Sequence, residues 1–559
     1  MSQLAMILAA AVALLTTRVS DAGTWRNVVT NAPGSVQLMI LLSDGTVMCS
    51  DGGNGAWYKL TPDSTGNYTN GSWTTLSSMN YTRRYFSSAV LRDGRVFVAG
   101  AEYGTGTTNA EIYNPLSNTW TPVPVPPGLI TTNNNPVATN KFQNTAGFSD
   151  SSSIILPDGR VLIAPVNPAA GVSTVTYNPY ANSWTSNTVL GNQNEATWVK
   201  LPDDSILTID KSSTATERFI PSLNQWIPDS NTPANVYGVG AELGPALLLP
   251  NGKVFFLGGN TNTLIYTPSG TTNQGSWVAG PPIPNGQACP DAPAAMLVNG
   301  KVIFACNPLG IPGTTFPTNV SFYEYDPVAN SYTRQNSPTG GLTETNIAAY
   351  QTAMLCLPDG TVLYSDETSQ VYIYDPNDSP LTAGAPVINS ITWDPGGSLH
   401  LTGKRLNGIS QGASYGDDEQ MDSNYPLVRF GDGNGGLYYG RTYNWSDTGV
   451  MTGEKVVTTE VMPPWSRLLT PGPYPFSVVV NGIASFPAAL NAPTWVDYNY
   501  SGPFEFGSYV FPYNSLAEGQ DDVPTGGTIA MKPGVSPEAL TLTRAMTIVS
   551  VGGDVTIGR

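Results

Sequence analysis

Phenolic and acidic side chains recur in this chain at a fixed distance ahead of a repeated turn. Each turn is Asp-Gly or a close variant between two β-rich runs, a pattern typical of a tight β-hairpin, whose turn needs positive φ. Since the residue eight or nine places earlier begins the first strand of each hairpin, we expect these side chains to converge around one axis. The residues at these positions are Tyr85, Asp150, Glu195, Glu242, Asp291 and Tyr350, with Tyr103 and Gln351 expected beside them.

Three roles are open for such a ring of oxygen atoms. Carboxylates and phenols are hard donors that suit Ca²⁺, which takes about six to eight of them. Paired carboxylates are also the groups that perform acid/base chemistry on a glycan. The third role is architectural: each acid would be bonded to backbone amides at the start of a strand and would hold the repeats together.

The elements that position these residues repeat along residues 23–384. Seven turns lie roughly 45 to 65 residues apart, the range of a kelch propeller blade. Aromatic pairs, such as Tyr113 with Trp120 and Tyr177 with Trp184, mark the outer half of the units. The sequence therefore predicts a seven-bladed β-propeller with turns at Asp44-Gly45, Asp93-Gly94, Asp158-Gly159, Asp203-Asp204, Asn251-Gly252, Asn299-Gly300 and Asp359-Gly360.

The two ends of the propeller segment are expected to meet. The seventh unit has its turn and Tyr374-Asp375-Pro376 but no final Trp, whereas Gly23-Thr24-Trp25 matches the Asn-Thr-Trp ends of other units. We therefore predict that residues 24–29 form the outer strand of the seventh blade. This closure would protect the last open sheet edge.

The rest of the sequence predicts three further segments of an all-β protein. Residues 1–22 contain an apolar run that is too short to span a bilayer and ends at small residues, so they are interpreted as a secretory signal peptide. Residues 385–497 carry alternating strands typical of an immunoglobulin-like β-sandwich. Residues 498–559 carry short strands at close intervals, like a β-helix rung that would dock on its neighbours, self-associate, or be the remnant of a longer chain.

Composition narrows the classes of partner. A net charge of −17 disfavours nucleic acid and anionic membranes as partners, since both require a concentrated basic surface. No later stretch has the length and apolarity of an integral membrane segment. The four cysteines fit export without a dense disulfide framework, and three alternatives stay open for them: a Cys289–Cys306 bridge, a Cys49–Cys356 bridge, or simple burial.

Together, the propeller and the following sandwich resemble the galactose oxidase and glyoxal oxidase family of copper radical oxidases, over roughly residues 23–493. The stretch from Ile409 to Asp418, and on to Asn444-Trp445, is similar to the early-set domain of bacterial members. The resemblance implies copper at one mouth of the propeller axis, bound by two tyrosines and two histidines, with one tyrosine cross-linked to a cysteine. Tyr85 matches the cross-linked tyrosine and Tyr350 the axial one.

The other copper positions depart from the family pattern. Gln351 stands where the family has histidine, Val36 where it has the cross-linking cysteine, and Tyr103 where it has a stacking tryptophan. His400 is the chain's one histidine, and it falls on a predicted strand, where an ordinary packed or surface residue is expected. Because copper needs imidazole or thiolate donors, we expect no copper and no other resident cofactor, with calcium still open.

Our leading hypothesis is a secreted, non-oxidase, galactose oxidase-like protein that binds carbohydrate or assembles on an extracellular surface. A glycan hydrolase or lyase that uses Glu195 and Asp291 is the second hypothesis. A structural subunit of an envelope, filament or virion is the third. Further candidates for sugar stacking or calcium are Trp57, Tyr58, Trp198 and Tyr237, and the acidic run Asp417-Asp418-Glu419.

Overall fold

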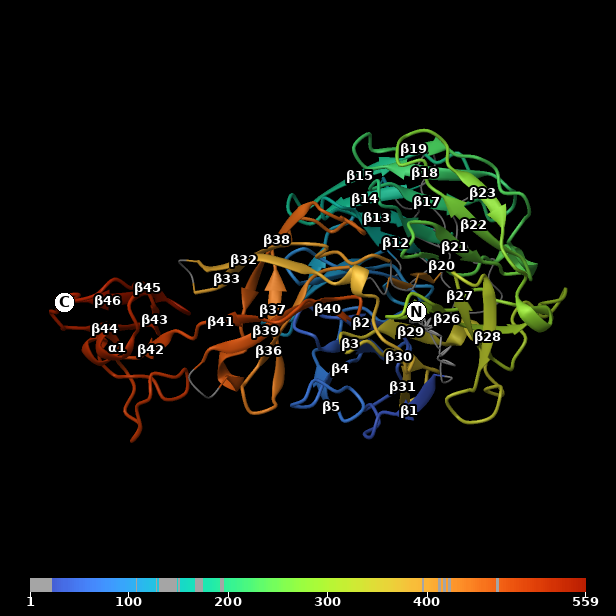
Figure 1. Ribbon diagram of the computed structural model, residues 1–559. Coiled ribbons are helices and arrows are strands. Elements are labelled where there is room, and N and C mark those ends of the chain that lie inside the picture. The colour runs from blue at the N-terminus through green and yellow to red at the C-terminus, as the bar shows by residue number, and fades with distance from the viewer. Residues whose placement is uncertain are drawn as a thin grey trace, which may run out of the picture.

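The computed structural model describes residues 23–106, 108–126, 128–129, 148, 151–165, 174–191, 196–394, 397–410, 414–415, 419–420, 424–468 and 472–558. Three bodies follow one another in chain order: a ring of sheets, a curved sheet beside it, and a small C-terminal body farthest from the ring (Figure 1). Within these ranges, no helix is long and apolar enough to cross a membrane.

The ring consists of seven antiparallel sheets, so the predicted seven-bladed propeller is confirmed. In the first four blades, the strands follow one another outward from the axis. Blade one contains β2 (Met39–Leu41), β3 (Val47–Ser50), β4 (Trp57–Thr61) and β5 (Ser72–Leu76), and blade two contains β7 (Ser87–Val90), β8 (Val96–Ala99), β10 (Ala110–Asn114) and β11 (Thr119–Val123). Blade three contains β12 (Ser152–Ile155), β13 (Val161–Ala164), β14 (Thr174–Asn178) and β15 (Ser183–Asn187), and blade four contains β16 (Trp198–Lys200), β17 (Ile206–Ile209), β18 (Thr216–Ile220) and β19 (Gln225–Pro228).

The last three blades complete the ring. Blade six carries one extra short strand, and blade seven takes its outer strand from the start of the chain. Blade five contains β20 (Ala246–Leu248), β21 (Val254–Leu257), β22 (Thr263–Thr267) and β23 (Ser276–Ala279), and blade six contains β24 (Gln287–Ala288), β25 (Ala294–Met296), β26 (Val302–Pro308), β27 (Ser321–Asp326) and β28 (Ser331–Gln335). Blade seven contains β29 (Ala353–Cys356), β30 (Val362–Ser365), β31 (Val371–Asp375) and β1 (Thr24–Asn27), and a two-stranded pair joins β6 (Arg83–Arg84) to β9 (Tyr103–Gly104).

All seven predicted turns share one hydrogen bond. In each, the Asp or Asn Oδ1 accepts from the backbone amide two residues on, at N···O distances of 3.0–3.2 Å. The residue between them has positive φ: it is glycine in six turns, and Asp204 with φ 70° in the seventh. A side chain that mimics a backbone turn is the reason Asp and Asn mark these positions in the sequence.

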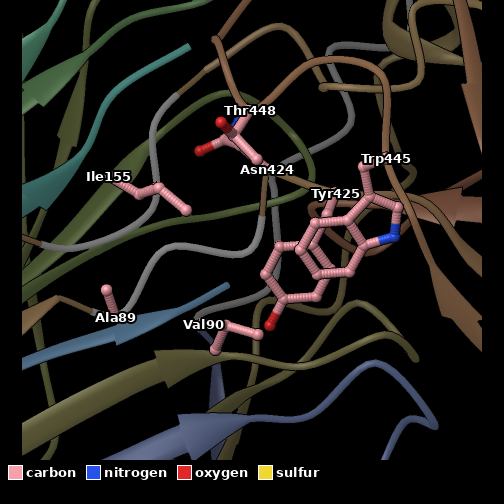
Figure 2. A pocket seen from close by; sticks show the side chains of 7 residues that line it. All are labelled: Ala89, Val90, Ile155, Asn424, Tyr425, Trp445 and Thr448. Atoms are coloured by element: carbon pink, nitrogen blue, oxygen red, sulfur yellow. The ribbon is translucent and has the colours of Figure 1, made fainter. Parts of the chain in front are cut away.

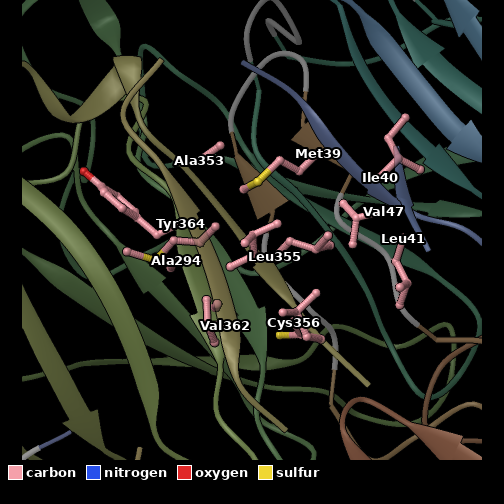
Figure 3. Packing of buried hydrophobic residues seen from close by; sticks show 14 of the residues in the cluster. Met39, Ile40, Leu41, Val47, Ala294, Ala353, Leu355, Cys356, Val362 and Tyr364 are labelled. Atoms are coloured by element: carbon pink, nitrogen blue, oxygen red, sulfur yellow. The ribbon is translucent and has the colours of Figure 1, made fainter. Parts of the chain in front are cut away.

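The ring closes through the first strand, as predicted. β1 pairs antiparallel with β31, and Trp25 lies opposite Tyr374 with ring centroids 4.8 Å apart. Blades one and seven also share a buried core, in which Met39 and Val47 lie near Leu355 (Figure 3). Closure therefore joins the two chain ends by backbone pairing and by apolar packing.

The second body is one curved sheet of eight strands, consistent with the predicted β-sandwich. Its own core contains Leu399, Phe430 and Val478, all fully buried. The strands are β32 (Val387–Trp393), β33 (Leu399–Lys404), β36 (Leu427–Gly431), β37 (Leu437–Tyr443), β38 (Val456–Met462), β39 (Tyr474–Val480), β40 (Ile483–Ala484) and β41 (Ala488–Leu490), in the order β32-β33-β38-β37-β36-β39-β40, with β41 also on β39.

This sandwich covers the face of the propeller that carries the turns. Thr442 N donates to Ser43 O at 3.0 Å, Trp445 N to Arg92 O at 3.2 Å and Thr448 N to Pro157 O at 3.1 Å. Each acceptor directly precedes the turn residue Asp44, Asp93 or Asp158. One segment of the sandwich thus bonds to blades one, two and three at every third residue.

A second sandwich segment reaches the axis itself. The two short strands β34 (Ser414–Tyr415) and β35 (Glu419–Gln420) form a hairpin. The hairpin contacts β7, β12, β20 and β25, which are the innermost strands of four different blades. Residues 409–424, which include this hairpin, contain no histidine.

The C-terminal body combines parallel strands with one helix. β42 (Thr494–Val496), β43 (Thr528–Met531) and β45 (Thr547–Ser550) pair in parallel, as do β44 (Gly534–Ser536) and β46 (Val555–Ile557), in keeping with the predicted β-helix-like arrangement. The helix α1 (Leu516–Asp522) was not predicted, and the Ser515 Oγ accepts from Glu518 N at 3.3 Å as its N-cap. Short 3₁₀ turns elsewhere are η1 (Val239–Ala241), η2 (Pro284–Gly286), η3 (Ala349–Gln351), η4 (Thr382–Gly384) and η5 (Trp465–Arg467).

Candidate functional site at the distal end of the propeller axis

Tyr85 and Tyr350 meet at the end of the axis away from the sandwich, which we call the distal end. Tyr85 lies between β6 and β7, and Tyr350 lies in η3 just before β29. Their ring centroids are 6.5 Å apart. The structure therefore brings these two phenols together at one end of the axis.

An arginine and a glutamate complete the group. Arg84 Nη2 lies 2.6 and 2.7 Å from the two carboxylate oxygens of Glu367 and donates to the Tyr85 hydroxyl at 3.0 Å. The Tyr85 and Gln351 side chains also hydrogen-bond to Glu367. We call Arg84, Tyr85, Tyr350, Gln351 and Glu367 the mouth cluster.

The charges of the mouth cluster are set by burial and by this pairing. Burial opposes the charge on Arg84, but Tyr85 and Glu367 outweigh it and raise the pKa of the guanidinium. Burial raises the pKa of Glu367 above its usual range, while Arg84 and the hydrogen bonds act in the opposite direction. Burial, assisted by Glu367, also raises the pKa of Tyr350, so this phenol stays protonated at neutral pH.

Three residues near this end of the propeller have positive φ, as other residues do elsewhere in the described chain. Tyr85 has φ 52°, Glu367 has φ 61° and Asp291 has φ 43°. Side-chain-bearing residues rarely adopt positive φ, and each such position costs roughly 1–3 kcal/mol unless its surroundings fix it. Strain of this kind is found preferentially at functional sites.

Aromatic rings surround the mouth cluster. The Tyr103 ring lies 6.1 Å from the Tyr85 ring, and the Phe316 ring lies 4.6 Å from the Tyr350 ring. Tyr103, Phe316 and Tyr350 are partly exposed, whereas Tyr85 is buried. The distal end therefore presents ring surfaces and fixed hydrogen-bonding groups together.

The predicted acidic positions are resolved only in part. Glu242 follows η1 in blade five, and Asp291 N of blade six donates to Leu243 O at 2.9 Å, so these two acids start adjacent blades. Asp150 and Glu195 lie outside the described residues. The complete acidic ring stays a prediction, and the structure adds a fixed cation, Arg84, to the distal end.

The donors at the distal end do not fit copper. Around the two phenols lie a guanidinium, an amide and a carboxylate, whereas copper favours imidazole and thiolate. The position of the cross-linking cysteine is held by Val36, which is buried, and His400 lies on β33 of the sandwich. The Arg84 cation, 3.0 Å from the Tyr85 oxygen, would also repel a metal ion there.

Several other predicted candidates fall elsewhere. Trp57 and Trp198 are buried in the propeller core and offer no ring face to a ligand, so that part of the aromatic prediction was wrong. The Tyr58 hydroxyl donates to Asp51 at 3.0 Å, and Tyr237 is partly exposed. The four cysteines are buried free thiols, so of the three alternatives for them the structure shows simple burial and neither disulfide bridge. Asp417 and Asp418 lie outside the described residues.

The opposite end of the axis is closed by apolar packing. The Tyr425 ring stacks on the Trp445 ring at 4.3 Å, and both reach from the sandwich toward β7 and β12 (Figure 2). The Tyr425 hydroxyl donates to the carbonyl of Leu41. A cavity between the sandwich and blades two and three measures about 10 Å³, which is about the room that one water molecule needs. It is lined by Ala89, Val90, Ile155, Asn424, Tyr425, Trp445 and Thr448.

Arg84 and Glu367 are the functional residues that the sequence analysis missed. The sequence analysis counted residues backward from each turn, which locates only the start of the innermost strand of each blade. In an antiparallel hairpin, a residue a given number of places before the turn lies beside the residue the same number of places after it. The Arg84–Tyr103 pairing and the Gln351–Glu367 hydrogen bond are examples. Glu367 stands eight residues after Asp359, so a forward count would have found it.

The fold and the site together define a seven-bladed propeller followed by a β-sandwich, with a mouth cluster of phenol, guanidinium and carboxylate. No family model matches the chain. Two curated proteins, both galactose oxidase of Gibberella zeae, are each 44% identical over 55 residues, which is 10% of this chain and 8% of theirs. This match confirms the predicted resemblance to galactose oxidase over that stretch and leaves most of the length of these relatives unmatched.

Two solved structures are similar in fold. A fungal alcohol oxidase of the AA5 family, in complex with copper, aligns with 84% of this chain and 100% of its own, at 14% identity and a TM-score of 0.48. A streptogramin B lyase aligns with 63% of this chain and 98% of its own, at 12% identity and a TM-score of 0.42. At these values the likeness carries no inference about activity or ligand.

Proposed function

We propose that this protein is a secreted, non-oxidase, galactose oxidase-like binding protein whose distal end takes carbohydrate. The observation that carries the proposal is the ion pair between Arg84 and Glu367 beside the Tyr85 phenol. It places fixed donors and acceptors where the family resemblance implies a redox metal. The proposal of secretion rests on the apolar run in residues 1–22, which ends at small residues as a secretory signal does.

The chemistry of the mouth cluster supports a polar, uncharged ligand with many hydroxyl groups. Arg84, Gln351 and Glu367 provide planar donors and acceptors that their mutual hydrogen bonds hold in place. The faces of Tyr103 and Tyr350 suit the apolar face of a sugar ring, since amphipathic rings commonly pair an apolar body with a polar tip. The name of the 55-residue match, galactose oxidase, points to a sugar for that relative.

A binding experiment tests the proposal directly. The chain without its first 22 residues would be screened on a broad glycan array, and hits would be titrated by calorimetry. Arg84→Met and Tyr350→Ala are expected to weaken binding by about tenfold or more, because each removes a buried or stacked contact. Arg95→Met is the matched control, since Arg95 forms a similar ion pair with Asp93 at 2.7 Å on the sandwich-covered face.

The non-oxidase part needs its own measurement. Purified protein would be loaded with Cu²⁺, dialysed, and assayed for peroxide with primary alcohols and aldehydes. We expect no peroxide above a protein-free control. Peroxide formation that Tyr85→Phe abolishes would overturn the non-oxidase proposal, and failure to bind any glycan on the array would overturn the carbohydrate proposal.

A further inference from the structure

The chain's one histidine lies in a cluster on the sandwich that the distal site does not use. His400 on β33 is the cross-strand partner of Glu460 on β38 and of Thr392 on β32. Asp394 follows β32 at the turn that leads into β33, and its carbonyl and amide bond to Gly397 N and Ser398 O, both at 2.9 Å. Three separate strands therefore bring an imidazole and two carboxylates to one place.

The ligand atoms of this cluster converge closely. One atom each from Asp394, His400 and Glu460 lie within 4.8 Å of one another. His400 Nδ1 is 2.8 Å from Glu460 Oε1, and the Ser398 hydroxyl is 3.4 Å from Glu460 Oε2 and 3.5 Å from Asp394 Oδ2. The His400 side chain is 36% exposed and that of Glu460 is 19% exposed, so an ion can enter from solvent.

Two ionised carboxylates this close repel each other, and a bound cation would remove that repulsion. The nearest lysine or arginine ion pairs of this sheet, Lys404–Glu454 and Arg405–Glu454, involve a different glutamate. Among the described residues, the His400 imidazole and the Ser398 hydroxyl contact the two carboxylates, and the imidazole is itself a metal ligand.

We propose that Asp394, His400 and Glu460 bind one divalent transition-metal cation, with zinc as the representative ion. One imidazole nitrogen and two carboxylate oxygens form a donor set that zinc accepts, and water would fill the remaining positions. Calcium and magnesium, which favour oxygen donors alone, should bind more weakly. This site is independent of the mouth cluster and of the carbohydrate proposal.

The bound cation would fix the turn on which the C-terminal body rests. A Cβ at Gly397 would lie 2.4 Å from Val551 Cγ2, which shows how closely this turn approaches the strand end after β45. Trp393, at the end of β32, stacks on Trp465 with ring centroids 5.7 Å apart, and Trp465 contacts Trp495 of β42 at 5.2 Å. Zinc should therefore stabilise the junction between the sandwich and the C-terminal body.

The test uses the whole chain without a polyhistidine tag, treated with chelator and then titrated with ZnCl₂ by calorimetry. We expect one Zn²⁺ per chain. Selective ¹⁵N-histidine labelling gives an unambiguous second readout, because the chain has one histidine and its imidazole nitrogens should shift as zinc is added. Thermal melting should occur at higher temperature with zinc than without it.

Variants decide which residues bind. His400→Asn should abolish zinc binding, and Glu460→Gln or Asp394→Asn should weaken it by about tenfold or more. Glu454→Gln, on the same sheet, should bind zinc as the unchanged chain does. The proposal is overturned if the imidazole signals do not move at millimolar zinc, or if His400→Asn binds zinc with unchanged affinity; normal circular dichroism of each variant shows that it has folded.

Discussion

The two ends of the propeller axis are built from the same strands but differ in the groups that form their hydrogen bonds. At the sandwich-covered end, backbone amides of Thr442, Trp445 and Thr448 bond to three successive blades, and the stacked Tyr425 and Trp445 rings leave a cavity of about 10 Å³ against blades two and three. At the distal end, the side chains of the mouth cluster bond mainly to one another, and their backbones carry positive φ at Tyr85 and Glu367.

This difference suggests a division of roles along the propeller axis, with stability at the covered end and ligand chemistry at the distal end. Backbone bonds between repeated turns are insensitive to side-chain identity, so the covered end can hold the domains together while the sequence varies. A side-chain cluster depends on each of its members, and its strained backbone is maintained by the rest of the blade. The distal end is therefore where substitutions can change the chemistry of a propeller of this plan without loss of its fold.

The largest expected effect on stability comes from a substitution at the sandwich-covered end. Trp445 is fully buried, stacks on Tyr425 and donates from Nε1 to Thr442 Oγ1 at 3.0 Å. Trp445→Ala should lower the free energy of unfolding by about 3–5 kcal/mol, the usual cost of emptying a buried tryptophan site. Urea denaturation measures the change. Glycan binding at the distal end should be unchanged below the transition, and a loss of binding there would break the separation between the two ends.

A buried ion pair near the distal end should have a similar effect on stability. Arg83 Nη2 lies 3.0 Å from Glu111 Oε1, and both side chains are fully buried. Arg83→Met should lower the free energy of unfolding by about 3–5 kcal/mol, because it leaves the Glu111 charge buried without its partner. The double variant Arg83→Met/Glu111→Gln should recover part of this loss in the same denaturation experiment. A double variant no more stable than Arg83→Met would show that lost packing, and not the unpaired charge, is responsible.

The contrast between local and long-range contacts also explains what the sequence could predict. The seven turns and the closing strand were predicted because an Asp or Asn side chain bonds to an amide two residues away, and a Trp marks six of the seven outer strands, with Tyr332 in blade six. Arg84 and Glu367 were missed because the count ran backward from the turns and selected phenols and acids, whereas Glu367 follows its turn and Arg84 is basic. The helix α1 was missed although Ser515 and Glu518 form the spacing of a capping box.

Stability should depend on pH through one carboxyl near Glu367. Glu344 is buried, accepts from the Tyr364 hydroxyl at 2.5 Å, and has its pKa raised by burial to about 7. The folded chain binds this proton more tightly than the unfolded chain, so the stability contribution is complete below about pH 4.3 and is lost as pH rises to about 7. Glu344→Gln should make the melting temperature less dependent on pH across this range. An unchanged slope would assign the pH dependence to another group.

The smallest expected effect on stability belongs to Arg84, and it is the sharpest test of the comparison. Arg84 and Glu367 side chains are 29% and 17% exposed, whereas the neighbouring Arg83 and its partner are fully buried. Arg84→Met should therefore lower the free energy of unfolding by about 1 kcal/mol or less. The same change should weaken glycan binding, which Arg83→Met should leave intact once the protein is folded. If Arg84→Met destabilised the chain as much as Arg83→Met does, the mouth cluster would be a structural element like the covered end, and the distal end would have no claim to be the binding site.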